Sequence, residues 1–196
     1  MITLKNISKS FGGLKAVQDV SIEIEKGSIT GLIGPNGAGK TTLFNIIAGF
    51  YKADTGSITL NNEDISGLRS DQLFAKGLLR TFQIAHEFDN LSVRENLMMV
   101  PIDQAGENII NTWLFPGKIK KEEKINHDRA SEVMDFLGLY HLRNEKAGIL
   151  SGGQKKLLEL GRTMMVDAKI VLLDEVGAGV NKTLLKKISK SIARLN

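Results

Sequence analysis

The segment Gly34-Pro35-Asn36-Gly37-Ala38-Gly39-Lys40-Thr41 decides the fold class. It matches the pattern G-x-x-x-x-G-K-[ST], in which a glycine-rich backbone wraps its N–H groups around phosphate oxygens. In such a loop Lys40 supplies positive charge to the β- and γ-phosphates, and Thr41 supplies a hydroxyl ligand for Mg²⁺. From average composition, the pattern arises by accident in on the order of 1% of chains this long. The sequence therefore predicts a nucleotide-phosphate site from Gly34 to Thr42.

The residues on both sides of this loop have the strand-then-helix order that the pattern requires. The apolar run Ile29 to Ile33 predicts a buried strand, and residues 43–47 predict a helix. Apolar and polar residues alternate over 20–24 and 58–60, which is typical of strands with one wet face. We expect the first third of the chain to combine antiparallel strands with the first unit of a parallel α/β sheet.

Helical spacing replaces the strand signals from about residue 84 to about residue 168. Apolar residues recur there in two stripes at helical spacing, with methionines that we expect to fill the core. The stripes are Ala130, Val133, Met134 and Leu137, and Leu157, Leu158, Gly161, Met164 and Met165. Trp113, Leu114 and Phe115 form an apolar cluster between them, before Pro116. We expect this cluster to pack onto the helical region rather than to form a binding patch.

A second strand signal comes near the end of the chain. The run Ile170 to Leu173 predicts a strand buried on both faces, and Asp174 and Glu175 follow at its carboxyl end. Open α/β sheets bind their ligands at that end. Asp174 is therefore the predicted carboxylate that holds Mg²⁺, and Glu175 is predicted to orient or deprotonate an attacking water. A salt-bridged surface acid is the alternative for Glu175.

The pentapeptide Leu150-Ser151-Gly152-Gly153-Gln154 directly precedes the second helical stripe. Ser151 is a candidate N-cap, and the two glycines leave the first N–H groups of the helix open to an anion. An ordinary capped helix is the alternative. Because the first loop already encloses the phosphates of one nucleotide, this second site either takes a distinct ligand or completes the site of another subunit. In an isologous dimer it would do so twice.

Composition limits the remaining classes of function. The 196 residues include 26 Lys and Arg, 22 Asp and Glu, and no cysteine, with a formal charge of +4. The absence of cysteine excludes a disulfide framework, a thiolate nucleophile and a Cys-based metal site. The N-terminus lacks a secretory signal and no stretch reads as a membrane span, so we expect a cytoplasmic protein. We expect the small positive excess to serve solubility rather than nucleic-acid or acidic-membrane binding.

The order of GPNGAGKTT, LSGGQ and IVLLDE resembles that of the ATP-binding subunits of ABC transporters over essentially the whole chain. The resemblance implies an α/β P-loop nucleoside triphosphate hydrolase with a mainly parallel core sheet, an antiparallel N-terminal β subdomain and an inserted helical subdomain. Residues 1–196 would form a single cassette. Residues 1–83 and 169–196 would be its core with the antiparallel strands, and residues 84–168 its helical subdomain.

The same resemblance implies roles for further residues, with ATP and Mg²⁺ as cofactors. Phe11, in KSFGGLKAV, would stack on adenine, although by itself it reads as a core residue. Gln83, in RTFQIAHEF, would contact Mg²⁺ or the attacking water and sense the membrane partner. The catalytic candidates are Lys40, Gln83 and Glu175, the metal candidates are Thr41, Gln83 and Asp174, and the second nucleotide surface is Ser151, Gly152, Gly153 and Gln154.

Several further segments, SFGGLKAV, GLLRTFQ, LSVRENL and AGVN, are similar to those of importers of branched-chain amino acids and of related amides or urea. The similarity implies permease subunits in the membrane as partners, and a homodimer or a heterodimer with a paralogous cassette. It also implies an indirect link to a periplasmic binding protein, no nucleic acid, and a peripheral position at the cytoplasmic face of the inner or plasma membrane.

Two departures from the family pattern bear on activity. Val176 stands where the family usually has proline, and no histidine follows Glu175, although the family has a switch histidine beyond that point. His86, His127 and His141 all precede LSGGQ. We therefore expect a C-terminal part of the cassette to be missing. If that part is missing, one alternative to an active transport ATPase is a nucleotide-binding cassette with weak or no hydrolysis. A second alternative, of another functional class, is a non-transport ABC ATPase that acts in DNA repair or translation.

Overall fold

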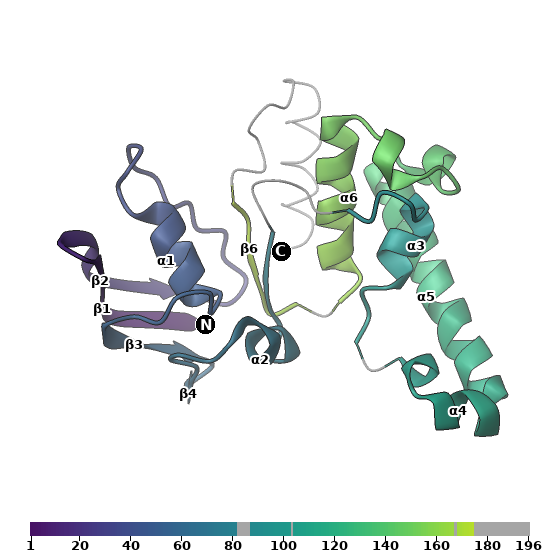
Figure 1. The fold of residues 1–196 in the computed structure, drawn as a ribbon, viewed down its shortest axis with the longest axis horizontal. Helices are drawn as coiled ribbons and strands as arrows, with labels where there is room; N and C mark the ends of the chain where they lie inside the picture. Colours follow the sequence, from purple (N-terminus) through teal and green to yellow (C-terminus); the bar gives the residue numbers. More distant parts are fainter. Residues whose placement is uncertain (82–86, 103, 167, 175–196) are drawn as a thin grey trace. The chain divides into compact units, whose positions relative to one another are not determined.

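The computed structural model describes residues 1–81, 87–102, 104–166 and 168–174. The chain forms two compact units, one from Met1 to Arg80 and one from Thr81 onward (Figure 1). No helix within the described ranges is long and apolar enough to cross a bilayer.

The first unit is built on an antiparallel sheet with the strand order β2-β1-β3-β4 (Figure 1). Its strands are β1 (Ile2–Phe11), β2 (Leu14–Ile24), β3 (Thr55–Leu60) and β4 (Glu63–Asp64). Side chains on one face are buried, namely Ile2, Leu4, Ile7, Val17, Ile58 and Leu60. Asn61 and Asn62 both have positive φ, which is the backbone that a two-residue hairpin between β3 and β4 requires. The predicted antiparallel strands are thus confirmed.

The glycine-rich loop of the first unit leads into helix α1 (Lys40–Ile47), and the unit also holds α2 (Ser70–Ala75) and β5 (Leu78–Arg80). Leu43, Ile46 and Ile47 bury one face of α1, as the sequence predicts.

The strand predicted over residues 29–33 is wrong for this structure. The run carries no strand, and Ile29 and Ile33 are 61% and 93% exposed. An apolar run forms a buried strand only where neighbouring strands accept its backbone hydrogen bonds. In the unit Met1–Arg80, which the structure describes throughout, no strand pairs with it. This unit alone therefore does not build the expected start of a parallel sheet.

The second unit is mostly helical. In the part that the structure describes, its elements are α3 (Val93–Met98), η1 (Ala105–Glu107), α4 (Ile109–Leu114), α5 (Pro116–Leu137), η2 (Tyr140–Leu142), η3 (Ala147–Ile149), α6 (Gly152–Met164) and β6 (Ile170–Leu172). Side chains of α3, α5 and α6 share one core. Both predicted helical stripes lie in it, with Met134 and Met165 buried and Met164 partly buried. The prediction that these methionines fill the core is confirmed.

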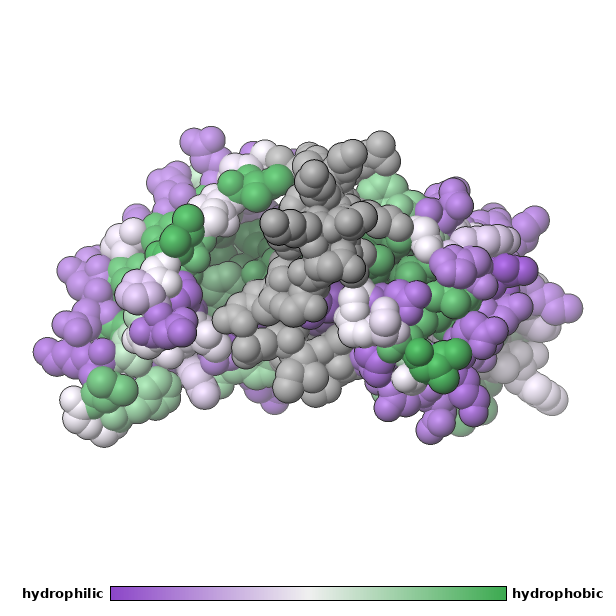
Figure 2. Space-filling model, turned by 90° about the horizontal axis from the view of Figure 1, so that it is seen from above, coloured by the Kyte–Doolittle hydropathy of each residue, from purple (hydrophilic) through white to green (hydrophobic). Residues whose placement is uncertain are grey.

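The prediction for the apolar cluster before Pro116 is wrong. Trp113, Leu114 and Phe115 are 87%, 55% and 54% exposed. The core of the unit is filled by α3, α5 and α6, whereas α4 lies at the far end of α5, away from α6 (Figure 1). Among the described residues of this unit, the cluster therefore lies apart from the core that α3, α5 and α6 share. Figure 2 shows apolar residues, in green, at the surface of this unit among polar ones.

Candidate functional site

The glycine-rich loop brings exposed backbone to the start of α1. Gly37 and Gly39 both have a φ of +81°, a left-handed conformation that favours glycine. A Cβ on Gly37 would meet nothing within 4 Å, whereas a Cβ on Gly39 would overlap the backbone oxygen of Ala16 in β2. Gly39 therefore lets the loop approach β2 closely. The loop residues 31–38 are exposed, and the loop ends at a helix N-terminus, which favours an anion.

Lys40 turns its side chain back over this loop. Its ammonium Nζ donates hydrogen bonds to the backbone oxygens of Gly34 and Pro35, at 2.7 Å each. The positive charge is thereby held beside the loop backbone. Thr41 is exposed and Thr42 half-buried in the first turn of α1. The residues from Gly34 to Thr42 thus form one continuous surface of N–H groups, hydroxyls and an ammonium, which suits a phosphate chain.

Phe11 is 43% exposed at the end of β1, so it is not the core residue that its sequence position suggests by itself. Its ring packs edge-to-face on Tyr51, with the ring centroids 5.3 Å apart, and Lys9 Nζ lies 5.5 Å from the Phe11 ring centroid. Tyr51 follows α1 and carries no motif, so the sequence offers no signal for this pair. An exposed, positioned aromatic face is what a stacking base requires.

Asp174 lies just after β6 in the second unit, where the sequence places it. Its backbone N–H donates to Thr81 Oγ1 at 3.3 Å, and the Thr81 N–H donates to the backbone oxygen of Leu172 at 3.0 Å. Thr81 is buried, at 2% exposure. Thr81 thus fixes the backbone of Asp174 directly. Gln83 and Glu175 lie outside the described residues.

Ser151 is the N-cap of α6, as predicted. Its hydroxyl accepts the N–H of Gln154 at 3.4 Å, and Gln154 Oε1 accepts the N–H of Ser151 at 2.8 Å, which makes a capping box. Gly152 is exposed, and a Cβ on it would meet nothing within 4 Å. The first turn of α6, with Gly153, is therefore accessible from outside the unit.

Lys155 is a neighbour of this turn that sequence reasoning missed. Its ammonium forms an ion pair with the Glu87 carboxylate, and it lies 3.6 Å from Asp89 Oδ1. The hydrogen bond to Glu87 raises the pKa of Lys155. The pair joins the first turn of α6 to the segment after Gln83, and residues so distant in the chain give no signal in a single sequence.

Three features together define a nucleotide-binding cassette of the P-loop class. They are the left-handed glycines of the phosphate loop, the Lys40 side chain folded over that loop, and the capped, glycine-rich start of α6. The family described as ABC transporter matches residues 17–178, and the chain belongs to this family. Members of this family are in general ATPases.

Three relatives of the chain are named as ATP-binding proteins of branched-chain amino acid transport. The chain is 44% identical over 184 residues to a probable branched-chain amino acid transport ATP-binding protein LivG of Archaeoglobus fulgidus, covering 94% of this chain and 70% of the relative. It is 41% identical over 195 residues to the protein of the same name in Methanocaldococcus jannaschii, covering 100% and 75%. The high-affinity branched-chain amino acid transport ATP-binding protein LivG of Escherichia coli is 35% identical over 195 residues, with 100% and 76% covered.

Two of the solved structures that share the fold are ATP-binding cassettes of ABC transporters. One is a nucleotide-free ATP-binding cassette from an ABC transporter, with a TM-score of 0.81, 41% identity and coverage of 99% of this chain and 76% of that chain. The other is an ADP conformation of such a cassette, with a TM-score of 0.82 and the same identity and coverage. These matches confirm the predicted fold class, a P-loop α/β cassette, and show that cassettes of this kind bind nucleotide.

Proposed function

We propose that this chain binds and hydrolyses ATP as the energy-coupling cassette of an importer of branched-chain amino acids or similar small solutes. The observation that carries the proposal is the geometry of the loop Gly34–Thr42, where Lys40 and the start of α1 converge on one exposed surface. The transport proteins among the relatives supply the expected solute class.

In this proposal the first unit binds the nucleotide. Phe11 offers its exposed ring to adenine, and the N–H groups of the loop bind the phosphates. The Lys40 ammonium exchanges the carbonyls of Gly34 and Pro35 for phosphate oxygens, to which it bonds more strongly because they are charged.

Two residues, one in each unit, carry oxygen atoms of the kind that Mg²⁺ takes as ligands. Thr41 presents an exposed hydroxyl, and Asp174 a carboxylate whose backbone is fixed by Thr81. Oxygen ligands of this kind suit Mg²⁺, which keeps several waters and neutralises charge on the phosphates when bound. Glu175 would accept a proton from the attacking water, and Gln83 would orient that water or contact the metal.

The turn from Ser151 to Gln154 would bind the nucleotide of a second cassette, identical or paralogous. An open helix N-terminus with a satisfied N-cap supports this role. Permease subunits in the membrane would be the further partners, at the cytoplasmic face. Within one cassette, residues 84–168 would act as the helical subdomain, and residues 1–83 with 169–196 as the core and antiparallel strands.

Substitution of Lys40 and Glu175 tests the proposal. We expect Lys40→Ala to weaken nucleotide binding and to lower ATP turnover about 100-fold, because it removes the charge held over the loop. Glu175→Gln should lower turnover by a similar factor of about 100 while nucleotide binding persists. Binding is measured by titration with a fluorescent ATP analogue, and turnover by phosphate release.

Lys26→Ala is the matched control, since Lys26 is an exposed lysine of the same unit outside the loop. Wild-type turnover in both Lys40→Ala and Glu175→Gln would refute the assignment. Binding that depends on Lys40, without turnover in the unaltered chain, would favour the alternative of a cassette that binds but does not hydrolyse.

A further inference from the structure

The ring of Phe11, which is proposed above to stack on adenine, has a second aromatic ring beside it in the same unit. Tyr51 meets it edge to face, with the ring centroids 5.3 Å apart and the ring planes at 71° to each other. Both residues are 43% exposed, so the pair lies at the surface rather than in the core. An aromatic pair of this geometry favours one arrangement of its rings beyond the gain from apolar area alone. The contact with Tyr51 therefore limits the directions in which the Phe11 ring can point.

Tyr51 is itself anchored to the helix that starts at the phosphate loop. Its backbone N–H donates to the backbone oxygen of Asn45 in α1 at 3.1 Å, and the Phe50 N–H donates to the same oxygen at 2.9 Å. Helix α1 begins at Lys40, directly after the loop. One continuous segment of the first unit thus runs from the phosphate loop through α1 to Tyr51, and the side chain of Tyr51 ends on the Phe11 ring.

The backbone next to Phe11 is fixed independently, by Asp54. Its Oδ1 accepts from Lys9 Nζ at 2.6 Å, and its Oδ2 accepts the Ser10 N–H at 2.7 Å. These hydrogen bonds, that from Lys9 foremost, hold the pKa of the Asp54 carboxyl below its usual value. The Lys9 ammonium lies 5.5 Å from the centroid of the Phe11 ring, so Asp54 also holds a cation beside that ring. Loss of the Tyr51 ring would therefore release the side chain of Phe11 but leave the end of β1 in place.

We propose that Tyr51 is a positioning residue for the nucleotide base, which holds the Phe11 ring in the orientation that stacking requires. This role rests on the proposed function, because it requires that Phe11 contacts the base. A ring that is already oriented loses less conformational freedom when a ligand binds, and this saving strengthens binding. Only a ligand that carries a base benefits from it. Tyr51 should therefore affect the affinity for ADP and not the affinity for pyrophosphate.

ADP and pyrophosphate test this role, because both carry a diphosphate and only ADP carries a base. We expect Tyr51→Ala to weaken ADP binding about fivefold, which is the size of one lost aromatic pair. Its affinity for pyrophosphate should stay within about twofold of the unaltered chain, because the loop N–H groups and Lys40 are unchanged. Tyr51→Phe preserves the ring and should bind both ligands like the unaltered chain. Both affinities are measured by isothermal titration calorimetry with Mg²⁺ present.

A double-mutant cycle distinguishes positioning from direct contact with the base. Phe11→Ala should weaken ADP binding about tenfold through lost stacking. Tyr51→Ala added to Phe11→Ala should cause no further loss, since Tyr51 acts only through the Phe11 ring. Additive losses would mean that Tyr51 contacts the base itself, and they would overturn the positioning role.

Tyr140→Ala is the matched control. The chain has two tyrosines, and Tyr140 lies in the second unit with an exposed fraction of 42%, close to that of Tyr51. Tyr140→Ala should bind both ligands like the unaltered chain.

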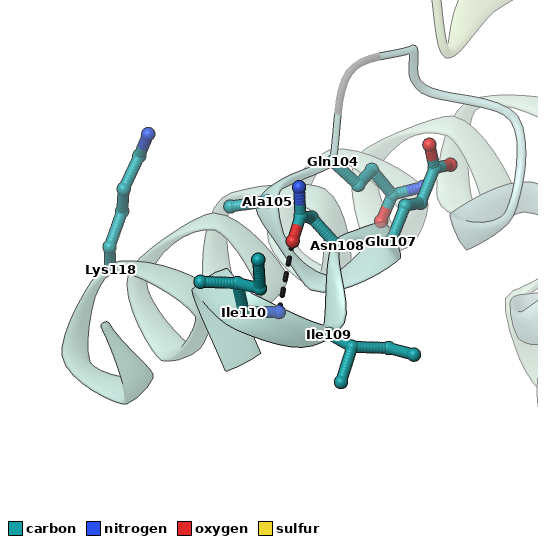
Figure 3. Close-up of a pocket in the computed structure, with 7 residues that line it drawn as sticks. All are labelled: Gln104, Ala105, Glu107, Asn108, Ile109, Ile110 and Lys118. Atoms are coloured by element: carbon teal, nitrogen blue, oxygen red, sulfur yellow. Dashed lines mark hydrogen bonds between the residues drawn. The ribbon is translucent and has the colours of Figure 1, made fainter. Parts of the chain in front are cut away.

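A second control tests whether the diphosphate binds elsewhere. In the second unit a pocket borders the start of α4, and Glu107 and Lys118 are among the residues that line it (Figure 3). Figure 3 shows the Lys118 side chain extending beyond the helical backbone, where its ammonium could meet an anion. Lys118→Ala should leave both affinities unchanged. A loss of ADP affinity in Lys118→Ala would place the ligand in that pocket and overturn the proposal.

Failure of the positioning role is distinguishable from failure of the proposed function. If Lys40→Ala and Phe11→Ala both bind ADP like the unaltered chain, the nucleotide site is wrong and the role of Tyr51 is wrong with it. If Phe11→Ala weakens ADP binding and Tyr51→Ala does not, the site stands and the role of Tyr51 is refuted. An equal loss for ADP and pyrophosphate in Tyr51→Ala would also refute it, because Tyr51 would then act on the fold of the unit.

Discussion

Gly37 and Gly39 share the same backbone angle, a φ of +81°, but only one of them is confined by its surroundings. At Gly37 an added methyl group would enter open space, whereas at Gly39 it would overlap the backbone oxygen of Ala16. The pattern G-x-x-x-x-G-K-[ST] requires glycine at 39 and leaves position 37 free. The cause of the requirement is visible only when β2 lies against the loop.

The two glycines give a matched pair for a stability measurement. Gly37→Ala should lower the free energy of unfolding by about 1–2 kcal/mol, the cost of a left-handed residue with a side chain. Gly39→Ala should cost that amount plus about 1–3 kcal/mol of overpacking, because a backbone atom cannot swing aside. Urea unfolding followed by circular dichroism would measure both. Equal losses in the two variants would contradict the close approach of β2 to the loop.

At the scale of elements, the second unit contains two helices that begin in the same way. Ser92 caps α3 and Ser151 caps α6, and in each box the residue three positions on returns a hydrogen bond. The Ser92 hydroxyl accepts the Glu95 N–H at 3.2 Å, and the bonds from Ser92 lower the pKa of Glu95. Only the Ser151 capping box is proposed to contact nucleotide. A substitution of Ser151 therefore tests that contact, and the same substitution of Ser92 is its control.

Ser92→Ala and Ser151→Ala should each lower the free energy of unfolding by about 1 kcal/mol, because each leaves a first-turn N–H without its cap. Only Ser151→Ala should also lower ATP turnover, measured by phosphate release at saturating ATP. If both variants lose turnover to the same degree, the α6 turn acts only through stability and its proposed contact with nucleotide is wrong.

At the scale of the whole molecule, a hydrogen bond joins Thr81 to Asp174, the residue that we propose as a ligand for Mg²⁺. Thr81→Val removes the hydroxyl that accepts the Asp174 N–H but preserves the shape of the side chain. We expect the Mg²⁺ concentration for half-maximal ATP turnover to rise about fivefold, the equivalent of one lost hydrogen bond of about 1 kcal/mol. Thr81→Ser preserves the hydroxyl and should leave the Mg²⁺ dependence unchanged. A rise in both variants would show that packing, not the hydrogen bond, positions Asp174.

The sequence by itself determined the features that depend on neighbours in the chain. These are the phosphate loop before α1, the alternating strands of the antiparallel sheet, the helical stripes and the Ser151 cap, since each shows in the spacing of residues along the chain. The fold class followed from the order of the motifs along the chain.

Only the tertiary structure decided which surfaces find a partner. The apolar runs 29–33 and 113–115 look equally suited to burial in the sequence, yet the structure leaves both exposed, because burial depends on what distant segments bring beside them. The Phe11–Tyr51 ring pair and the Lys155–Glu87 ion pair could not be predicted either, because each joins residues that are far apart in the chain. The hydrophobic effect lowers the free energy of an apolar side chain that leaves water. The folded chain decides which apolar side chains can leave water.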